Sequence, residues 1–148
     1  MLYLQIPREL SLLTDLKVIS LDKNLLGKRL PGEILRLTAL QTLSVAVKRL
    51  TGSLPTELAE ATQLETLRLA SNLFEGSILS AIGQLNNLQQ LDLGSNRFEN
   101  ELPTELYQLT GLVWLSVEGN NDIIGRIPTE IARLTNLNYL SLSNTTLR

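Results

Sequence analysis

The sequence contains no cysteine and no histidine among its 148 residues. Without cysteine there is neither a disulfide framework nor a thiolate metal site. Without histidine the chain lacks the commonest general base and the commonest side-chain metal ligand. No phosphate-binding loop and no carboxylate pair in a predicted cleft compensates for these absences. The sequence therefore argues against an enzyme, and we expect no cofactor and no metal ion.

Aromatic residues make up 4% of the chain, and the net charge at pH 7 is −2. With so few rings, the core must be aliphatic. A nearly balanced charge predicts no binding surface for nucleic acid or for an anionic membrane. No apolar run approaches the roughly 18 residues of a membrane span. The first ten residues, MLYLQIPREL, also lack the basic and apolar segments of a signal peptide.

Leucine is what the chain has in excess, with 36 copies, and these copies recur in register. The stretch 88–112, LQQLDLGSNRFENELPTELYQLTGL, serves as a template that fits again in both directions along the chain. One landmark of the template recurs at steps of 24, 24, 24, 24 and 25 residues, at Pro7, Pro31, Pro55, Leu79, Pro103 and Pro128. A period of this length indicates a repeat architecture. We interpret residues 1–148 as a single array of about six 24-residue repeats.

One short segment in each repeat alternates apolar and polar residues. The six copies begin at Val18, Thr42, Thr66, Gln90, Trp114 and Tyr139. Such alternation predicts a strand with one buried face. The connections between copies are long enough for crossovers, so the six strands should be parallel.

A column of asparagines follows the strands, at Asn24, Asn72, Asn96 and Asn120. Their side chains are expected to bond backbone groups that would otherwise lack partners. The column is interrupted at Lys48 and Thr145, where a looser turn is predicted. An apolar residue and often a glycine come next.

Each repeat then continues with a Leu/Ile-Pro-x-Glu motif. Proline fits a first helical position and glutamate favours the helix dipole. The motif predicts a short helix or 3₁₀ turn on the side opposite the sheet. The recurring glutamates, Glu9, Glu33, Glu57, Glu105 and Glu130, are better explained by this dipole than by a row of metal ligands.

The consensus of these copies, LxxLxLxxNxLxGxIPxxLxxLxxL, resembles the plant-type leucine-rich repeat of receptor-like kinase ectodomains and polygalacturonase-inhibiting proteins. The resemblance covers essentially the whole chain. It implies an α/β repeat fold: a right-handed curved solenoid with a concave parallel β-sheet and short helices or 3₁₀ turns on the convex side. By analogy it also implies ligand recognition on the concave side, in an extracellular or membrane-attached parent protein.

The two ends of the array depart from the secreted members of this family, which usually carry cysteine-paired caps. Here the chain starts and stops within a repeat and has no cysteine. Uncapped ends would expose apolar core and a strand edge. We interpret the chain as a segment of a longer array; the alternative is self-association that buries both ends.

The outward strand positions hold the candidate binding residues. Trp114 and Tyr139 lie in one column, one repeat apart, and are expected to stack on the concave sheet. Exposed aromatics are common binding anchors, although the pair could simply cover the sheet as cross-strand neighbours. With Gln90 and Glu118 beside them, they predict a mixed polar and aromatic patch in the C-terminal half.

Arg68 and Asp92 share the next outward column in adjacent repeats. A ladder ion pair is the simplest interpretation, and contact with a ligand is the alternative. In the first complete repeat, Asp22 and Lys23 are interpreted as solvated charges.

Two functions follow from these observations. The first is an interaction module that binds a protein, a peptide or a glycan through the concave face, with a protein or peptide as the favoured ligand. The alternative is a structural or surface-binding array, such as an inhibitor-like, cell-wall or ice-binding protein. Binding a repeated surface would need a regular threonine or asparagine lattice, whereas the concave columns are irregular.

Overall fold

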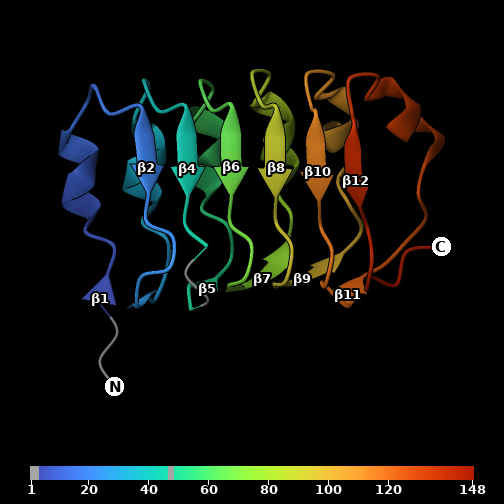
Figure 1. Cartoon of the computed structure of the whole chain (residues 1–148), viewed down its shortest axis with the longest axis horizontal. Coiled ribbons are helices and arrows are strands. Elements are labelled where there is room, and N and C mark those ends of the chain that lie inside the picture. The colour runs from blue at the N-terminus through green and yellow to red at the C-terminus, as the bar shows by residue number, and fades with distance from the viewer. Residues whose placement is uncertain (1–3, 47–48) are drawn as a thin grey trace.

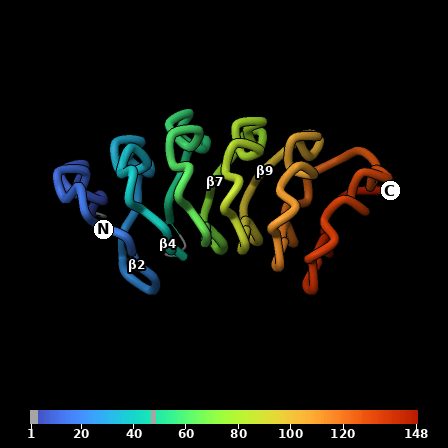
Figure 2. The backbone as a smooth tube through the Cα atoms, turned by 90° about the horizontal axis from the view of Figure 1, so that it is seen from above, coloured from blue at the N-terminus to red at the C-terminus, as the bar shows by residue number. Residues whose placement is uncertain are grey.

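A computed structural model describes residues 4–46 and 49–148. It is a solenoid of stacked coils (Figure 1) that curves into an arch (Figure 2). The six predicted strands form one parallel sheet in sequence order. They are β2 (Val18–Ser20), β4 (Thr42–Ser44), β6 (Thr66–Arg68), β8 (Gln90–Asp92), β10 (Trp114–Ser116) and β12 (Tyr139–Ser141). The alternation of apolar and polar residues therefore identified every strand of this sheet.

The register of the sheet places equivalent positions of successive repeats side by side. Leu43 pairs with Leu67 and Leu67 with Leu91, while Trp114 pairs with Tyr139 across the one 25-residue step. Buried leucines therefore stack on leucines behind the sheet, and the outward residues form continuous columns in front of it.

A second set of strands was not predicted. These strands are β1 (Leu4–Gln5), β3 (Leu26–Gly27), β5 (Thr51–Gly52), β7 (Leu73–Ser77), β9 (Arg97–Asn100) and β11 (Asp122–Ile123). β1 pairs with β3, and β5, β7, β9 and β11 form a four-stranded parallel sheet. Each follows the asparagine turn, where the sequence has no period-two alternation to identify it. The predicted single sheet was therefore incomplete.

Among the described residues, the convex side carries six 3₁₀ helices, as the Leu/Ile-Pro-x-Glu motif predicted. They are η1 (Arg8–Leu12), η2 (Gly32–Arg36), η3 (Thr56–Glu60), η4 (Ser80–Gln84), η5 (Thr104–Gln108) and η6 (Thr129–Arg133). The proline precedes the helix as its N-cap, one position earlier than predicted; Pro103 has φ −65° there. Glutamates such as Glu105 lie in the first turn, as expected. Seen from above, these helices follow the outside of the arch and the strands its inside (Figure 2).

The core between sheet and helices is mainly aliphatic, with Leu43, Leu67, Leu91 and Leu115 fully buried. The prediction of a purely aliphatic core is corrected by three aromatic residues, Phe74, Phe98 and Tyr107, which are its largest buried side chains; the two phenylalanine rings stack with centroids 6.1 Å apart. Burial of this apolar surface is the main stabilising contribution to the solenoid.

The asparagine column forms a hydrogen-bonded ladder, as predicted. Asn96 donates through Nδ2 to the carbonyls of Leu93 and Gly94 in its own turn and of Leu69 one repeat earlier. Its Oδ1 accepts from Phe74 N–H. Asn72 and Asn120 bond in the same way, so the ladder joins successive repeats.

The two predicted interruptions of the ladder have different outcomes. Lys48 lies outside the described residues. Thr145 replaces asparagine without losing the local bond, because its Oγ1 donates to Leu142 O at 2.8 Å. The looser turn predicted at Thr145 is therefore only partly correct: the bond within the turn is kept by the hydroxyl group.

Candidate functional site

The outward residues of the concave sheet form three columns, which begin at Val18, Ser20 and Asp22 and continue at the equivalent position of each repeat. The six predicted site residues lie close together in these columns. Arg68 comes from β6, Gln90 and Asp92 come from β8, Trp114 comes from β10 with Glu118 just after it, and Tyr139 comes from β12. The strands pair Gln90 with Trp114 and Trp114 with Tyr139. We call this set of six residues the polar–aromatic patch.

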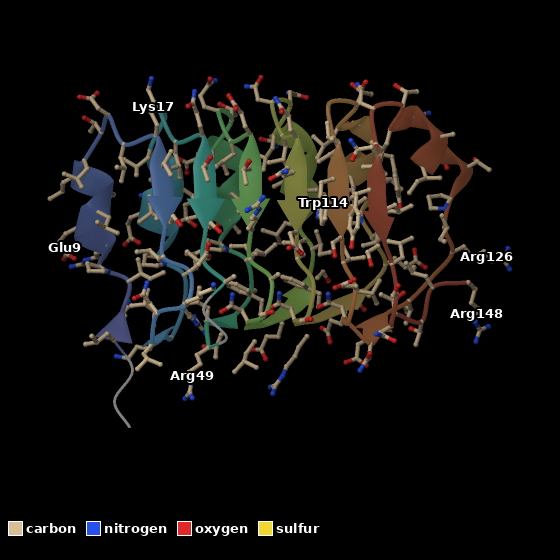
Figure 3. The ribbon with its side chains drawn as sticks, in the orientation of Figure 1. Glu9, Lys17, Arg49, Trp114, Arg126 and Arg148 are labelled. Atoms are coloured by element: carbon tan, nitrogen blue, oxygen red, sulfur yellow. The ribbon has the colours of Figure 1, made fainter. Side chains whose placement is uncertain are left out.

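Trp114 and Tyr139 form the centre of the patch and stack as predicted. Their ring centroids lie 3.5 Å apart and their planes differ by 8°. Both side chains are partly exposed. Figure 3 shows Trp114 on the six-stranded sheet, in the C-terminal half of the array. The pairing register places the two rings side by side, so they form an aromatic ridge on the concave sheet.

The predicted ion pair between Arg68 and Asp92 is wrong. Arg68 Nη2 donates to Gln90 Oε1 at 2.8 Å, and none of the ion pairs found within residues 4–46 and 49–148 involves Asp92. Gln90 and Asp92 lie two residues apart on the same strand, so an arginine on β6 can bond either one. The guanidinium group therefore orders the glutamine beside Trp114 rather than neutralising the carboxylate.

Asp92 and Glu118 approach each other over Gly94. A Cβ added at Gly94 would lie 3.1 Å from Glu118 Cγ, 3.2 Å from Ser116 Oγ and 3.3 Å from Asp92 Oδ1, so the Ser116 hydroxyl borders the same space. Burial raises the pKa of the Asp92 carboxyl above 3.8, and the Glu118 charge raises it further. The hydrogen bond from Gly94 N–H and the charge of Arg68 lower this pKa, but by less than the total increase. Sequence reasoning missed the role of Gly94, although this position is the only glycine in its outward column.

Asp22 is not a solvated charge, contrary to the prediction. Its carboxylate accepts from Ser44 Oγ at 2.9 and 2.7 Å, and from Ala46 N–H at 2.8 Å. Glu118 occupies the equivalent position and accepts from Ser141 Oγ in the following repeat. In both cases the partner of the carboxylate is a serine in the following repeat. Comparing the repeats for an acidic residue followed by such a serine could have found this bond from the sequence.

An open depression of about 610 Å³ lies at the C-terminal end of the array, lined by Glu101, Arg126, Arg148 and four further residues. None of the six patch residues lines it, and both arginines lie at the right-hand end in Figure 3. Within the described ranges, no group of three or more acidic residues could hold a metal ion. No helix in that part of the chain is long and apolar enough to cross a membrane.

The architecture defines a leucine-rich repeat solenoid, and the comparisons identify its family. The Leucine Rich Repeat family model matches residues 63–85 and 87–109. A search among curated proteins finds no match. The ectodomain of the receptor kinase SOBIR1 from Arabidopsis thaliana is 30% identical, with a TM-score of 0.82 over 88% of this chain and 71% of that one. The chain belongs to the plant-type leucine-rich repeat family.

Longer receptor ectodomains match over nearly the whole chain. The membrane receptor kinase GASSHO1/SCHENGEN3 from Arabidopsis thaliana, in complex with CASPARIAN STRIP INTEGRITY FACTOR 2, is 36% identical with a TM-score of 0.94. The Arabidopsis receptor kinase HAESA, in complex with the peptide hormone IDA and the co-receptor SERK1, is 33% identical with a TM-score of 0.91. Each match covers 97% of this chain, but only 17% and 24% of those structures.

A plant ice-binding protein shares the fold, with a TM-score of 0.85 over 97% of this chain and 54% of that one. At 24% identity this likeness concerns the fold alone. Leucine-rich repeat arrays of one architecture therefore serve different functions, and the function of this chain must be argued from its surface.

Proposed function

We propose that this array is a recognition module that binds a protein or peptide ligand through the polar–aromatic patch of its concave sheet. The observation that supports the proposal is the stacked, partly exposed pair Trp114 and Tyr139, whose rings are 3.5 Å apart on a face otherwise made mostly of small and polar residues. We also propose an extracellular or membrane-attached setting, as in the receptor ectodomains to which the chain is similar.

The patch has the composition of a binding anchor. Tryptophan and tyrosine contribute much of the energy of protein interfaces, and they work best when surrounded by polar residues that exclude water. Here Arg68 and Gln90 are already bonded to each other beside Trp114 at 2.8 Å. Little side-chain entropy would therefore be lost when a ligand covers them.

A binding role fits these groups better than catalysis or adsorption. The patch offers rings, carboxylates and an amide, but the chain has no histidine or cysteine to act as base or nucleophile. Adsorption to a regular surface would require repeated identical groups. The column containing Asp92 reads Ser20, Ser44, Arg68, Asp92, Ser116 and Ser141, so two charged residues of opposite sign interrupt its serines at the centre of the sheet.

The test uses a phage-displayed library of 12-residue peptides, selected on the immobilised chain and then measured by fluorescence anisotropy. The double variant Trp114→Ala with Tyr139→Ala should weaken the selected peptides by roughly 30-fold, as expected for a hot spot of about 2 kcal/mol. Val18→Ala is the matched control, because Val18 is 56% exposed in the same column at the other end of the sheet.

Circular dichroism of all three chains would show that the fold is retained. If the selected peptides bind the double variant as tightly as the original chain, the proposed site is refuted. If no peptide is enriched above background, a peptide-binding function is refuted.

A further inference from the structure

The two carboxylates of the polar–aromatic patch carry more negative charge than the protein itself compensates. Asp92 Oδ1 accepts from Gly94 N–H at 3.1 Å, and Glu118 Oε2 accepts from Ser141 Oγ at 2.5 Å. Among the described residues, neither Asp92 Oδ2 nor Glu118 Oε1 has a hydrogen-bond partner or an ion pair. Gly94 leaves the space in which these two groups converge.

The nearest cation does not compensate this charge. Arg68, on the neighbouring strand β6, gives its hydrogen bond to Gln90 Oε1. Its charge lowers the pKa of Asp92 less than burial and Glu118 raise it. Two charged groups therefore face Asp92 from the adjacent repeats. Arg68 lies on one side and is bonded to Gln90, and Glu118 lies on the other side.

The equivalent carboxylate at the N-terminal end of the same face has a different environment. Asp22 accepts three hydrogen bonds from two groups of the next repeat, Ser44 Oγ and Ala46 N–H. Its acceptors are thus used by the fold, and no second carboxylate or aromatic ring shares its surroundings in the three outward columns. The uncompensated charge is confined to the half of the sheet that also carries Trp114.

We propose that the ligand of this patch is a basic peptide segment, one arginine or lysine of which lies along the Trp114–Tyr139 ridge with its charged group between Asp92 and Glu118. This inference rests on the proposed function and specifies its ligand. A long basic side chain has an apolar stem that packs on ring edges and a head that donates to carboxylates. A guanidinium group could bond both free carboxylate oxygens at once.

The geometry agrees with the length of such a side chain. Asp92 lies two residues along β8 from Gln90, which pairs directly with Trp114. Adjacent strands are about 4.8 Å apart, and alternate residues on one face are roughly 6.6 Å apart. An extended arginine or lysine can span this separation while its backbone follows the concave face.

The test uses the same 12-residue phage-displayed library and a double-mutant cycle. We expect the enriched peptides to share an arginine or lysine. Replacing an arginine with citrulline, or a lysine with acetyl-lysine, keeps the aliphatic stem and removes the charge. The neutral peptide should bind the original chain about tenfold more weakly, as expected for the loss of a charge-assisted hydrogen bond.

Removing the two carboxylate charges from the protein should weaken binding as much as removing the positive charge from the peptide. Asp92→Asn with Glu118→Gln should weaken the basic peptide about tenfold and abolish its advantage over the neutral one. Glu75→Gln with Glu99→Gln is the matched control for net charge, because both glutamates are exposed on β7 and β9 of the other sheet. This control should change binding less than about twofold in moderate salt, where distant charges are screened.

The outcomes separate this inference from the function on which it rests. If removal of the two rings abolishes binding but removal of the two carboxylate charges does not, the basic ligand is refuted and the binding site stands. Enriched peptides that share no arginine or lysine would likewise refute the basic ligand alone. If removal of the rings has no effect, both proposals fail together. Binding of a neutral glycan that depends on Trp114 would also overturn the basic ligand.

Discussion

Replacement of Asn96 tests whether the ladder between repeats stabilises the solenoid. In Asn96→Ala, Phe74 N–H loses the acceptor Asn96 Oδ1 at 3.1 Å. The carbonyls of Leu69 and Leu93 keep bonds from the neighbouring ladder asparagines Asn72 and Asn120. The principal loss is therefore one buried amide left without a partner, which costs about 1–3 kcal/mol.

A loss of about 2 kcal/mol should lower the melting temperature of a chain of this size by roughly 4–8 °C. Thermal unfolding followed by circular dichroism, supported by urea titration, measures this change. Asn96→Asp should be more destabilising than Asn96→Ala at pH 7. The aspartate keeps the acceptor for Phe74, but it directs a negative charge at the carbonyls of Leu69, Leu93 and Gly94.

Asn24→Ala is the matched control for the Asn96 variants. Asn24 is exposed and, within residues 4–46 and 49–148, its side chain bonds only Leu21 O and Asp22 O in its own turn, so its replacement should cost less than about 0.5 kcal/mol. If Asn24→Ala and Asn96→Ala lower the melting temperature equally, the bonds between repeats are not what stabilises the ladder. If Asn96→Asp matches the original chain, the assigned orientation of the amide is wrong.

Two further predictions concern close packing and pH. Gly83→Ala should lower the free energy of unfolding by about 1–3 kcal/mol in urea titration, because the new Cβ would lie 2.6 Å from Glu105 Cβ. Gly111→Ala is the control and should be nearly neutral, because its Cβ would lie 3.6 Å from the nearest atom, Leu88 O. Asp92→Asn should raise the melting temperature at pH 7. Because the pKa of Asp92 is raised in the folded chain, its protonated carboxyl contributes fully to stability below pH 3.8, and this contribution is lost as the pH rises through the pKa of the folded state. The gain in melting temperature of Asp92→Asn over the original chain should therefore vanish at pH 3.5. An equal gain at both pH values would contradict the pKa assignment.

The sheet and the ladder could be predicted because they depend on one residue type at one recurring position. Leu67 and Leu91 are buried by the repeat itself, and Asn96 bonds the backbone of its own turn and of the repeat before it. The second sheet could not be predicted in this way. Strand β7, LFEGS, has no apolar alternation, and it is extended because its backbone pairs with β5 and β9 once the coils are stacked.

The glycine position after the asparagine turn shows a related limit. Gly52 and Gly76 adopt left-handed backbone with φ of 81° and 77°, as glycine readily does. Lys28 and Asn100 adopt the same conformation, with φ of 65° and 68°; asparagine tolerates it, whereas the lysine side chain disfavours it. The neighbouring coils therefore impose this conformation on Lys28, whose own preference would not reveal it.

The candidate site was predicted by position but not by partner. The position of a residue in a column shows which residues of the adjacent repeats lie beside it. It does not show which of two acceptors on the neighbouring strand a side chain will bond, and Arg68 bonds Gln90 rather than Asp92. That choice leaves a carboxylate uncompensated next to the exposed aromatic pair. Since the inward residues and the ladder asparagines are satisfied within the fold, the proposed recognition would have to use the outward positions where the repeats differ. Gly94 is one of these positions, because the absence of its side chain lets Asp92 and Glu118 converge.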